Sequence, residues 1–256
     1  MNLTHALSFS TKSAYPFRLI SCLAIVALIF NAAARGASIN YGNFNLPGIM
    51  FQGVTESSGT DPVPMYGPPS PFVIGLDFDP ISFTSTSTNG TADITDGQLN
   101  FTVMTLPGGP AIDGISLFEA GDYTLAGAGG PATSVFAGST LRATILAVDG
   151  VNVAPINVPP VNASFGDSLP GTVIAGPWSV GLFSNIVAAL PPGQHATKVD
   201  VVINNALVTT SEPGTVAFIA KKEFQIGITP GVPEPATATL MALACVGAIG
   251  LRRSRG

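Results

Sequence analysis

The sequence predicts an all-β fold, an antiparallel two-sheet sandwich of the jelly-roll or immunoglobulin-like kind. Hydrophobic residues make up 46% of the chain and charged residues only 10%, so its surface must be covered largely by Ser, Thr, Asn and Gly. Because 29 Gly and 22 Pro interrupt helical hydrogen bonding, long helices are disfavoured. Short apolar runs bounded by turn residues remain, and they are typical of a sandwich.

The first 34 residues are predicted to be a signal peptide that forms a helix ahead of the sandwich. Lys12 and Arg18 precede an apolar run from Leu19 to Phe30, which is too short for a comfortable membrane span. Small residues follow, and cleavage after Ala34 would place Ala32 and Ala34 at the positions that signal peptidase requires. A buried core helix is the alternative.

The rest of the chain is predicted to divide into three parts. Residues 35–71 are expected to be an irregular Pro/Gly-rich lead-in, because the Pro-rich stretch 61–71 denies a helix. Residues 72–230 are expected to form the sandwich, with roughly eight to ten strands. Residues 231–256 form a separate tail.

Turn chemistry predicts hairpins within residues 38–231, which we call the body. Asp96-Gly97 and Asp149-Gly150 tolerate the positive φ angles of tight turns, and Asn204-Asn205 is expected to act in the same way. A weaker hairpin is expected at Gly121.

Apolar residues at every second position support half-buried strands between these turns. Leu99, Phe101 and Val103 are expected on one face. In residues 215–228, one continuous inward phase is expected, with this set of inward residues: Val216, Phe218, Ala220, Phe224, Ile226 and Ile228. Residues 178–190 fit either a helix or a strand.

Charge and motifs exclude several kinds of function. Glu234 is the one acid of the 15 that lies outside the body, whereas the body has only four bases: Arg142, Lys198, Lys221 and Lys222. Such an acidic body repels phosphate backbones, so no nucleic-acid partner is expected. The two cysteines, Cys22 and Cys245, lie in the terminal apolar runs, which excludes thiol catalysis in the body. No nucleophile elbow, HExxH pair or phosphate-binding loop is present.

The remaining candidates for chemistry are weak, and we expect no catalytic residue, metal or cofactor. His195 lies in a Pro/Gly-rich stretch and is expected to be a solvated loop residue. Asp77 or Asp79 would serve a glycoside hydrolase, and with Asp93 and Asp96 they would offer oxygen ligands to calcium. A solvated face is the expected role of all four. Trp178 and Tyr66 could stack on sugars but are expected to be packing residues.

The tail combines an apolar segment with a basic end. Residues 236–251 carry no charge, and as a helix they would span about 24 Å, marginally enough to cross a membrane. Arg252, Arg253 and Arg255 would then stay cytoplasmic, which places the body outside. Pro233 and Pro235 keep Glu234 extended, as a processing enzyme requires. A buried C-terminal helix is the alternative.

These three tail elements resemble the PEP-CTERM sorting signal of exopolysaccharide-producing Gram-negative and related bacteria. The resemblance rests on Val232, Pro233, Glu234 and Pro235 as the recognition element, on the apolar run, and on the terminal arginines. It implies that an exosortase in the inner membrane cleaves near the Pro-Glu-Pro region. The protein would then be released to the cell surface or matrix.

We therefore expect an exported surface or extracellular-matrix protein without catalytic activity. Its expected partners are signal peptidase, exosortase, the inner membrane transiently, and exopolysaccharide or other surface proteins. A dedicated carbohydrate-binding module for exopolysaccharide is the first alternative, and a secreted glycoside hydrolase is the second.

Overall fold

The computed structural model describes residues 38–231. No helix in this part of the chain is long and apolar enough to cross a membrane. The predicted signal peptide 1–34, the apolar segment 236–251 and their flanking helices lie outside the described residues. The same holds for the individual processing and sorting residues: Ala32, Ala34, Val232, Pro233, Glu234, Pro235, Arg252, Arg253 and Arg255.

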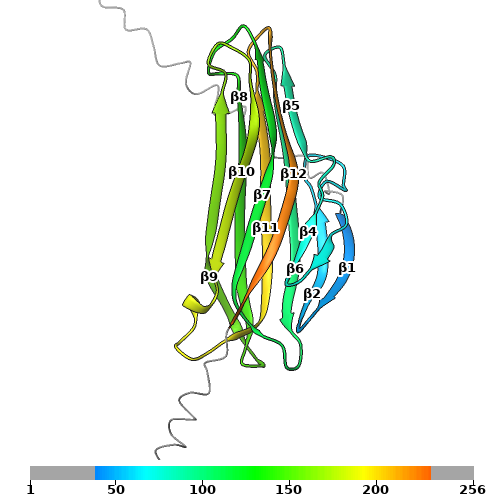
Figure 1. Ribbon diagram of the computed structural model, residues 1–256, viewed down its shortest axis with the longest axis vertical. Coiled ribbons are helices and arrows are strands. Elements are labelled where there is room, and N and C mark those ends of the chain that lie inside the picture. The colour runs from blue at the N-terminus through cyan, green and yellow to red at the C-terminus, as the bar shows by residue number, and fades with distance from the viewer. Residues whose placement is uncertain (1–37, 232–256) are drawn as a thin grey trace, which may run out of the picture. The chain divides into compact units, whose positions relative to one another are not determined.

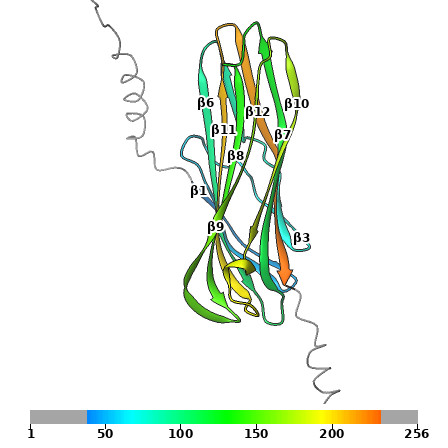
Figure 2. The same ribbon diagram turned by 90° about the vertical axis from the view of Figure 1, so that its left-hand side faces the viewer.

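Twelve strands form two sheets, and every strand pairing is antiparallel (Figures 1 and 2). Sheet A contains, in spatial order, β1 (Ser38–Leu46), β2 (Ile49–Ser57), β6 (Ala92–Thr105), β11 (Ala196–Thr210), β8 (Ser134–Val148) and β9 (Val151–Ser168). Sheet B contains β10 (Ile174–Asn185), β7 (Ala111–Gly127), β12 (Thr215–Gly231), β4 (Gly75–Phe78) and β3 (Ser70–Phe72). A further strand, β5 (Thr84–Thr88), pairs with the first part of β12.

The core lies between the two sheets, as Figure 2 shows with β6, β11 and β8 on one side and β12, β7 and β10 on the other. Leu99, Phe101 and Val103 point inward with at most 2% exposure, so the predicted alternation of β6 is confirmed. Inward residues of both sheets form one continuous apolar cluster. The predicted two-sheet antiparallel sandwich is therefore confirmed, with twelve strands instead of eight to ten.

The stretch 35–71, predicted to be an irregular lead-in, contains two full strands. β1 and β2 pair with each other, and β2 continues sheet A by pairing with β6. The loop after β2 is irregular, but it also packs into the core, because Met65 and Tyr66 are completely buried. The buried carboxylate of Glu56 accepts hydrogen bonds from the backbone N–H groups of both residues. The prediction extended the irregularity of the Pro-rich stretch 61–71 to residues 38–57, which contain strands of the sandwich.

Only one of the predicted tight turns is present. Asp149 (φ 49°) and Gly150 (φ 81°) connect β8 to β9 with the positive φ angles that were expected. Asp96-Gly97 lies inside β6, where a Cβ on Gly97 would come within 2.7 Å of the Phe83 ring. This glycine therefore serves close packing. The turns predicted at Asn204-Asn205 and at Gly121 are also wrong, since β11 and β7 run straight through them.

A bulge in β12 overturns the continuous phase that was predicted for this strand. The register shifts between Lys221 and Glu223, so the inward side changes from odd to even positions. Ala217 and Ile219 point inward before the bulge, and Phe224, Ile226 and Ile228 do so after it, whereas Val216 is 40% exposed. Lys221 is the last inward residue of the odd phase before the bulge, so it points into the core together with Ala217 and Ile219.

The segment 178–190, which fitted either a helix or a strand, is mostly strand. β10 extends to Asn185, with Trp178, Val180 and Leu182 buried at every second position. A short 3₁₀ helix, η2 (Val187–Ala189), follows it.

Candidate functional site

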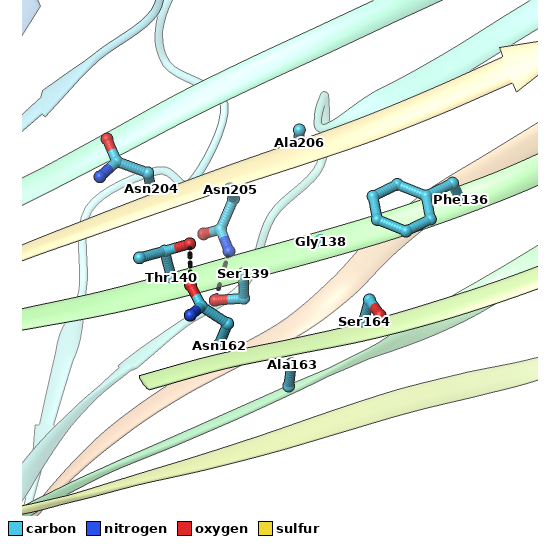
Figure 3. Close-up of a pocket in the computed structure, with 10 residues that line it drawn as sticks. All are labelled: Phe136, Gly138, Ser139, Thr140, Asn162, Ala163, Ser164, Asn204, Asn205 and Ala206. Carbon is cyan, nitrogen blue, oxygen red and sulfur yellow. Dashed lines mark hydrogen bonds between the residues drawn. The ribbon is translucent and has the colours of Figure 1, made fainter. Parts of the chain in front are cut away.

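A hollow of about 470 Å³ lies over β8, β9 and β11 of sheet A (Figure 3). Its floor is formed by small residues, because Gly138 on β8 is paired with Ala206 on β11 and with Ser164 on β9. Phe136 borders the hollow and is 44% exposed. Its ring covers Gly138 so closely that a Cβ there would lie 2.8 Å from the ring. The hollow thus combines an exposed apolar ring with a low floor.

A row of polar side chains crosses sheet A beside this floor. Strand register places the members next to one another on five strands, and we call them the polar row: Ser57, Gln98, Asn204, Thr140 and Asn162. Gln98 donates to the Asn204 side-chain oxygen at 2.7 Å. Figure 3 shows the second bond, in which Thr140 donates to the Asn162 side-chain oxygen at 2.7 Å. These bonds fix both Asn amides through their oxygens. Their N–H donors remain for other partners.

A second hollow of about 350 Å³ adjoins the first and shares Asn204 and Asn205 with it. Ser57, Gly59, Asp96 and Gln98 are among its lining residues. We call the two hollows together the groove. It crosses sheet A from β9 to β2 and offers amides, hydroxyls, one carboxylate and one aromatic ring. No cluster of three or more His, Cys, Asp or Glu residues that could hold a metal ion occurs in residues 38–231.

The carboxylate of the groove belongs to Asp96 and is tightly held. Its Oδ1 accepts hydrogen bonds from the Ser58 hydroxyl at 2.9 Å, the Gly59 N–H at 2.7 Å and the Thr60 N–H at 3.0 Å. Burial acts to raise the pKa of Asp96, but these bonds and one from the Thr60 hydroxyl outweigh it and lower the pKa below its ordinary value. Asp96 therefore anchors the loop after β2 and is ionised at neutral pH.

The four aspartates considered for calcium or hydrolysis are divided between the sheets. Asp77 is half-buried on β4 of sheet B, and Asp79 is exposed just beyond that strand. Asp93 and Asp96 lie on β6 of sheet A, where Asp93 accepts a hydrogen bond from the Thr86 N–H at 2.8 Å. The structure does not bring the four together.

The other sequence candidates serve structure. His195 precedes β11, with its Nδ1 3.6 Å from a carboxylate oxygen of Asp113. Trp178 is 3% exposed and donates to the Ala220 carbonyl at 3.0 Å, and Tyr66 is fully buried. Neither aromatic ring is accessible to a ligand.

Sheet B carries a different outer surface. Register aligns Phe183, Ser116, Gly227, Gly75 and Phe72 across β10, β7, β12, β4 and β3. A hollow of about 500 Å³ lies here, lined by Phe72 and Phe118. The exposed fractions are 41% for Phe72, 44% for Phe118 and 51% for Phe183. We call this surface, with its three phenylalanines and small central residues, the Phe face.

The groove residues were missed in the sequence because their proximity depends on register between distant strands. The sequence contained one usable signal, since Gln98, Asn100 and Thr102 alternate with the buried Leu99 and Phe101. That pattern marks the outer face of a strand as polar. It does not show which strands lie beside it.

Among solved structures, distant similarity is found to β-rich carbohydrate-binding proteins. TmCBM61 in complex with β-1,4-galactotriose is 11% identical, over 62% of this chain and 73% of that chain, with a TM-score of 0.20. A carbohydrate-binding module specific for non-crystalline cellulose, CBM28, is 9% identical over 61% and 78%, with a TM-score of 0.21. Lectin UEA-II complexed with galactose is 9% identical over 75% and 98%, with a TM-score of 0.25. Similarity this low carries no information about a ligand.

The sequence comparisons identify the tail. No curated protein matches the chain as a relative. Residues 231–255 match the family model of the PEP-CTERM protein-sorting motif, which confirms the resemblance drawn from the tail residues. The motif implies processing by exosortase, export and sorting to the cell surface. This chain therefore carries a PEP-CTERM protein-sorting motif behind a twelve-stranded β-sandwich.

Proposed function

We propose that this protein is a non-catalytic component of the cell surface or extracellular matrix that binds a neutral glycan strand in the groove of sheet A. The proposed ligand is the exopolysaccharide of the producing cell. Signal peptidase would cut after Ala34, and exosortase would cut near Pro233–Pro235 while residues 236–251 cross the inner membrane and the terminal arginines stay inside.

The observation that carries the proposal is the polar row. Sugars present hydroxyl groups that donate and accept hydrogen bonds, together with apolar ring faces. Asn162 and Asn204 are pre-positioned by Thr140 and Gln98, so little side-chain freedom is lost when a ligand binds them. Phe136, close to the row, offers an exposed ring for an apolar sugar face.

Charge favours a neutral ligand. Asp96 is ionised in the groove, and the chain as a whole carries a formal net charge of −5. A polyanionic glycan would therefore be repelled at the groove and by the body.

Affinity electrophoresis of the mature protein in gels containing the producer's own exopolysaccharide tests this function. We expect the glycan to retard the native protein and the retardation to fall in the double variant Asn162→Ala/Asn204→Ala. Asn152→Ala is a matched control, because Asn152 is an exposed residue of β9 that does not line the groove. Equal retardation of the double variant and the control would rule out the groove.

A second candidate function is packing against neighbouring surface proteins through the Phe face. It is favoured by the exposed rings of Phe72, Phe118 and Phe183, which are unusually apolar for a solvated sheet surface. Replacing all three by Ser should then reduce association of the protein with the isolated cell surface but leave glycan retardation unchanged.

A glycoside hydrolase acting through Asp77 or Asp79 is the third candidate function. The variant Asp77→Asn/Asp79→Asn decides it, since loss of activity on a glycan panel would show catalysis. Under our proposal neither the native protein nor the variant hydrolyses any member of the panel.

A further inference from the structure

A cluster of polar side chains lies between the two sheets, and the groove does not account for it. Lys221 comes from β12, Glu119 from β7, Asn205 from β11 and Tyr66 from the loop before β3. Their exposed fractions are 1%, 1%, 4% and 0%, respectively. A lysine and a glutamate this deep in a sandwich are costly, because charges lose their hydration there. The cluster therefore requires an explanation.

One carboxylate connects an amine to an amide. Glu119 Oε2 lies 2.6 Å from Lys221 Nζ, and Glu119 Oε1 accepts a hydrogen bond of 2.6 Å from Asn205 Nδ2. The same Nδ2 also donates to the Ser139 hydroxyl at 2.9 Å, a contact that Figure 3 shows from the side of the groove. The amine of Lys221, the carboxylate of Glu119 and the amide of Asn205 therefore form a connected chain, in which the carboxylate can accept a proton from the amine.

The carbonyl of that amide is polarised. The Tyr66 hydroxyl donates a hydrogen bond of 2.6 Å to Asn205 Oδ1. Burial raises the pKa of Tyr66 well above its ordinary value, and the negative charges of Glu119 and Glu56 raise it further. The phenol therefore keeps its proton. A fixed donor on a carbonyl oxygen stabilises the negative charge that develops when a nucleophile attacks the carbon.

The amine lies in apolar surroundings. Its Nζ lies 4.5 Å from the ring centroid of Phe83, 5.0 Å from that of Phe224 and 5.5 Å from that of Tyr66. Burial lowers the pKa of Lys221, although Glu119 partly opposes this. A lysine with a lowered pKa becomes a neutral, nucleophilic amine more readily.

We propose that Lys221 and Asn205 form an amide bond between their side chains, with Glu119 transferring the protons. Nothing beyond the folded chain is required, because neither oxidant nor cofactor takes part. The proposal stands independently of the glycan function.

The step balances as an acyl transfer. Glu119 accepts a proton from the Lys221 ammonium, and the Nζ lone pair attacks Asn205 Cγ, which places negative charge on Oδ1 beside the Tyr66 hydroxyl. Glu119 then moves a proton from Nζ to Nδ2, and the Cγ–Nδ2 bond breaks as the carbonyl re-forms. Ammonia leaves and takes up the proton that Glu119 still holds. An Nζ–Cγ amide and an ionised Glu119 remain.

The product would join the sheets covalently, since Asn205 belongs to sheet A and Lys221 to sheet B. It would also remove the charge of the buried amine. The body between residues 38 and 231 contains no cysteine, so disulfides are not available for the same purpose.

Mass spectrometry of the mature protein isolated from its producer tests the proposal. We expect an intact mass about 17 Da below that of the processed sequence, because ammonia is lost. A tryptic digest should contain a branched peptide joining Lys221 to Asn205, with no cleavage after Lys221. A native protein of full mass whose peptides end at Lys221 would overturn the proposal, as would a mass gain of about 1 Da from simple deamidation of Asn205.

Variants of Lys221 and Glu119 provide a second test of the amide bond. Lys221→Met and Glu119→Gln should each restore the full mass, while Lys222→Met serves as the control, because Lys222 points outward and pairs with Asp122. A mass deficit that persists in Lys221→Met would place the lost ammonia elsewhere and refute the assignment. If either core variant fails to fold, the mass and digest of the native protein still decide.

Discussion

Asn204 and Asn205 are neighbours on β11, yet their side chains point to opposite faces of sheet A. Asn204 points outward into the groove, where its oxygen is bound by Gln98 and its N–H donors are open to water or a ligand. Asn205 is 4% exposed, and its donors and its oxygen are bound by Glu119, Ser139 and Tyr66. Under our proposals, the same side-chain type would serve recognition outside, where hydrogen bonds are exchangeable, and chemistry inside, where an unpaired group is costly.

The largest expected change in stability follows from removing the buried partner of Lys221. Glu119→Ala should lower the free energy of unfolding by about 3–5 kcal/mol, because Lys221 would be left buried without its partner. Asp122→Ala removes the exposed partner of Lys222 and should cost at most about 1 kcal/mol. Denaturant unfolding of the mature variants measures both changes. Similar losses in the two variants would show that the interior pair is not buried as described.

Exchanging each asparagine for alanine compares the two sides directly. Asn205→Ala should destabilise the protein by about 1–3 kcal/mol, because it leaves Glu119 and Tyr66 without a hydrogen-bond partner. Asn204→Ala should change stability by no more than about 0.5 kcal/mol, since Asn204 is half-buried on the outer face of the sheet and not in the core. Thermal and denaturant unfolding of the two variants test this, and the reverse order of effects would contradict the assignment of their faces.

Removing one oxygen sharpens the comparison on the interior side. Tyr66→Phe keeps the ring contacts with Phe83 and Phe224 but deletes the hydroxyl that donates to Asn205. We expect a loss of about 1–2 kcal/mol and a larger uncrosslinked fraction by intact mass. Unchanged stability together with complete cross-linking would mean that the hydroxyl does not polarise the amide.

On the groove side, the expected effect is on binding alone. Asn204→Ala should weaken glycan binding about tenfold, which corresponds to about 1.4 kcal/mol and to one lost hydrogen-bonding group. Affinity electrophoresis over a range of glycan concentrations gives the ratio of dissociation constants. Asn152→Ala, which lies outside the groove, should bind as the native protein does, and a tenfold loss there would show that the effect is not specific to the groove.

The smallest expected effect is on the pH dependence of stability, through Asp96. Because the pKa of Asp96 is lowered on folding, its hydrogen bonds to the loop after β2 stabilise the protein above the unfolded-state pKa of about 4. That contribution is lost as the pH falls through the still lower folded-state value. Asp96→Asn should therefore be less stable than the native protein at pH 7, with the difference shrinking below about pH 4. A difference that is independent of pH would contradict this role.

The sequence could predict the local part of the fold. Leu99, Phe101 and Val103 revealed a half-buried strand, and Asp149-Gly150 revealed a turn, because both signals depend on adjacent residues. Gly97 misled the prediction because it allows the rings of Phe83 and Tyr66 to approach β6, which is a long-range requirement.

The candidate site was beyond prediction for a related reason. Asn204 and Asn205 were read as a turn, although each amide is held by residues from distant strands or loops. Lys221 was missed because the even phase of Phe224, Ile226 and Ile228 was extended backwards along β12, across a bulge that no local pattern indicates. The tail differs, because its recognition elements follow one another along the chain and can be read without a fold.

The sorting motif begins at Gly231, which is also the last residue of β12 and is paired with Ala111. If the mature protein stays attached to the envelope through this end, any pull from flow or from neighbouring cells enters the domain along β12. That strand lies between β7 and β4 within sheet B, so the load acts in shear on two ladders of hydrogen bonds at once. A Lys221 amide would lie on the same load path and would pass the force to the opposite sheet before β12 could be drawn out.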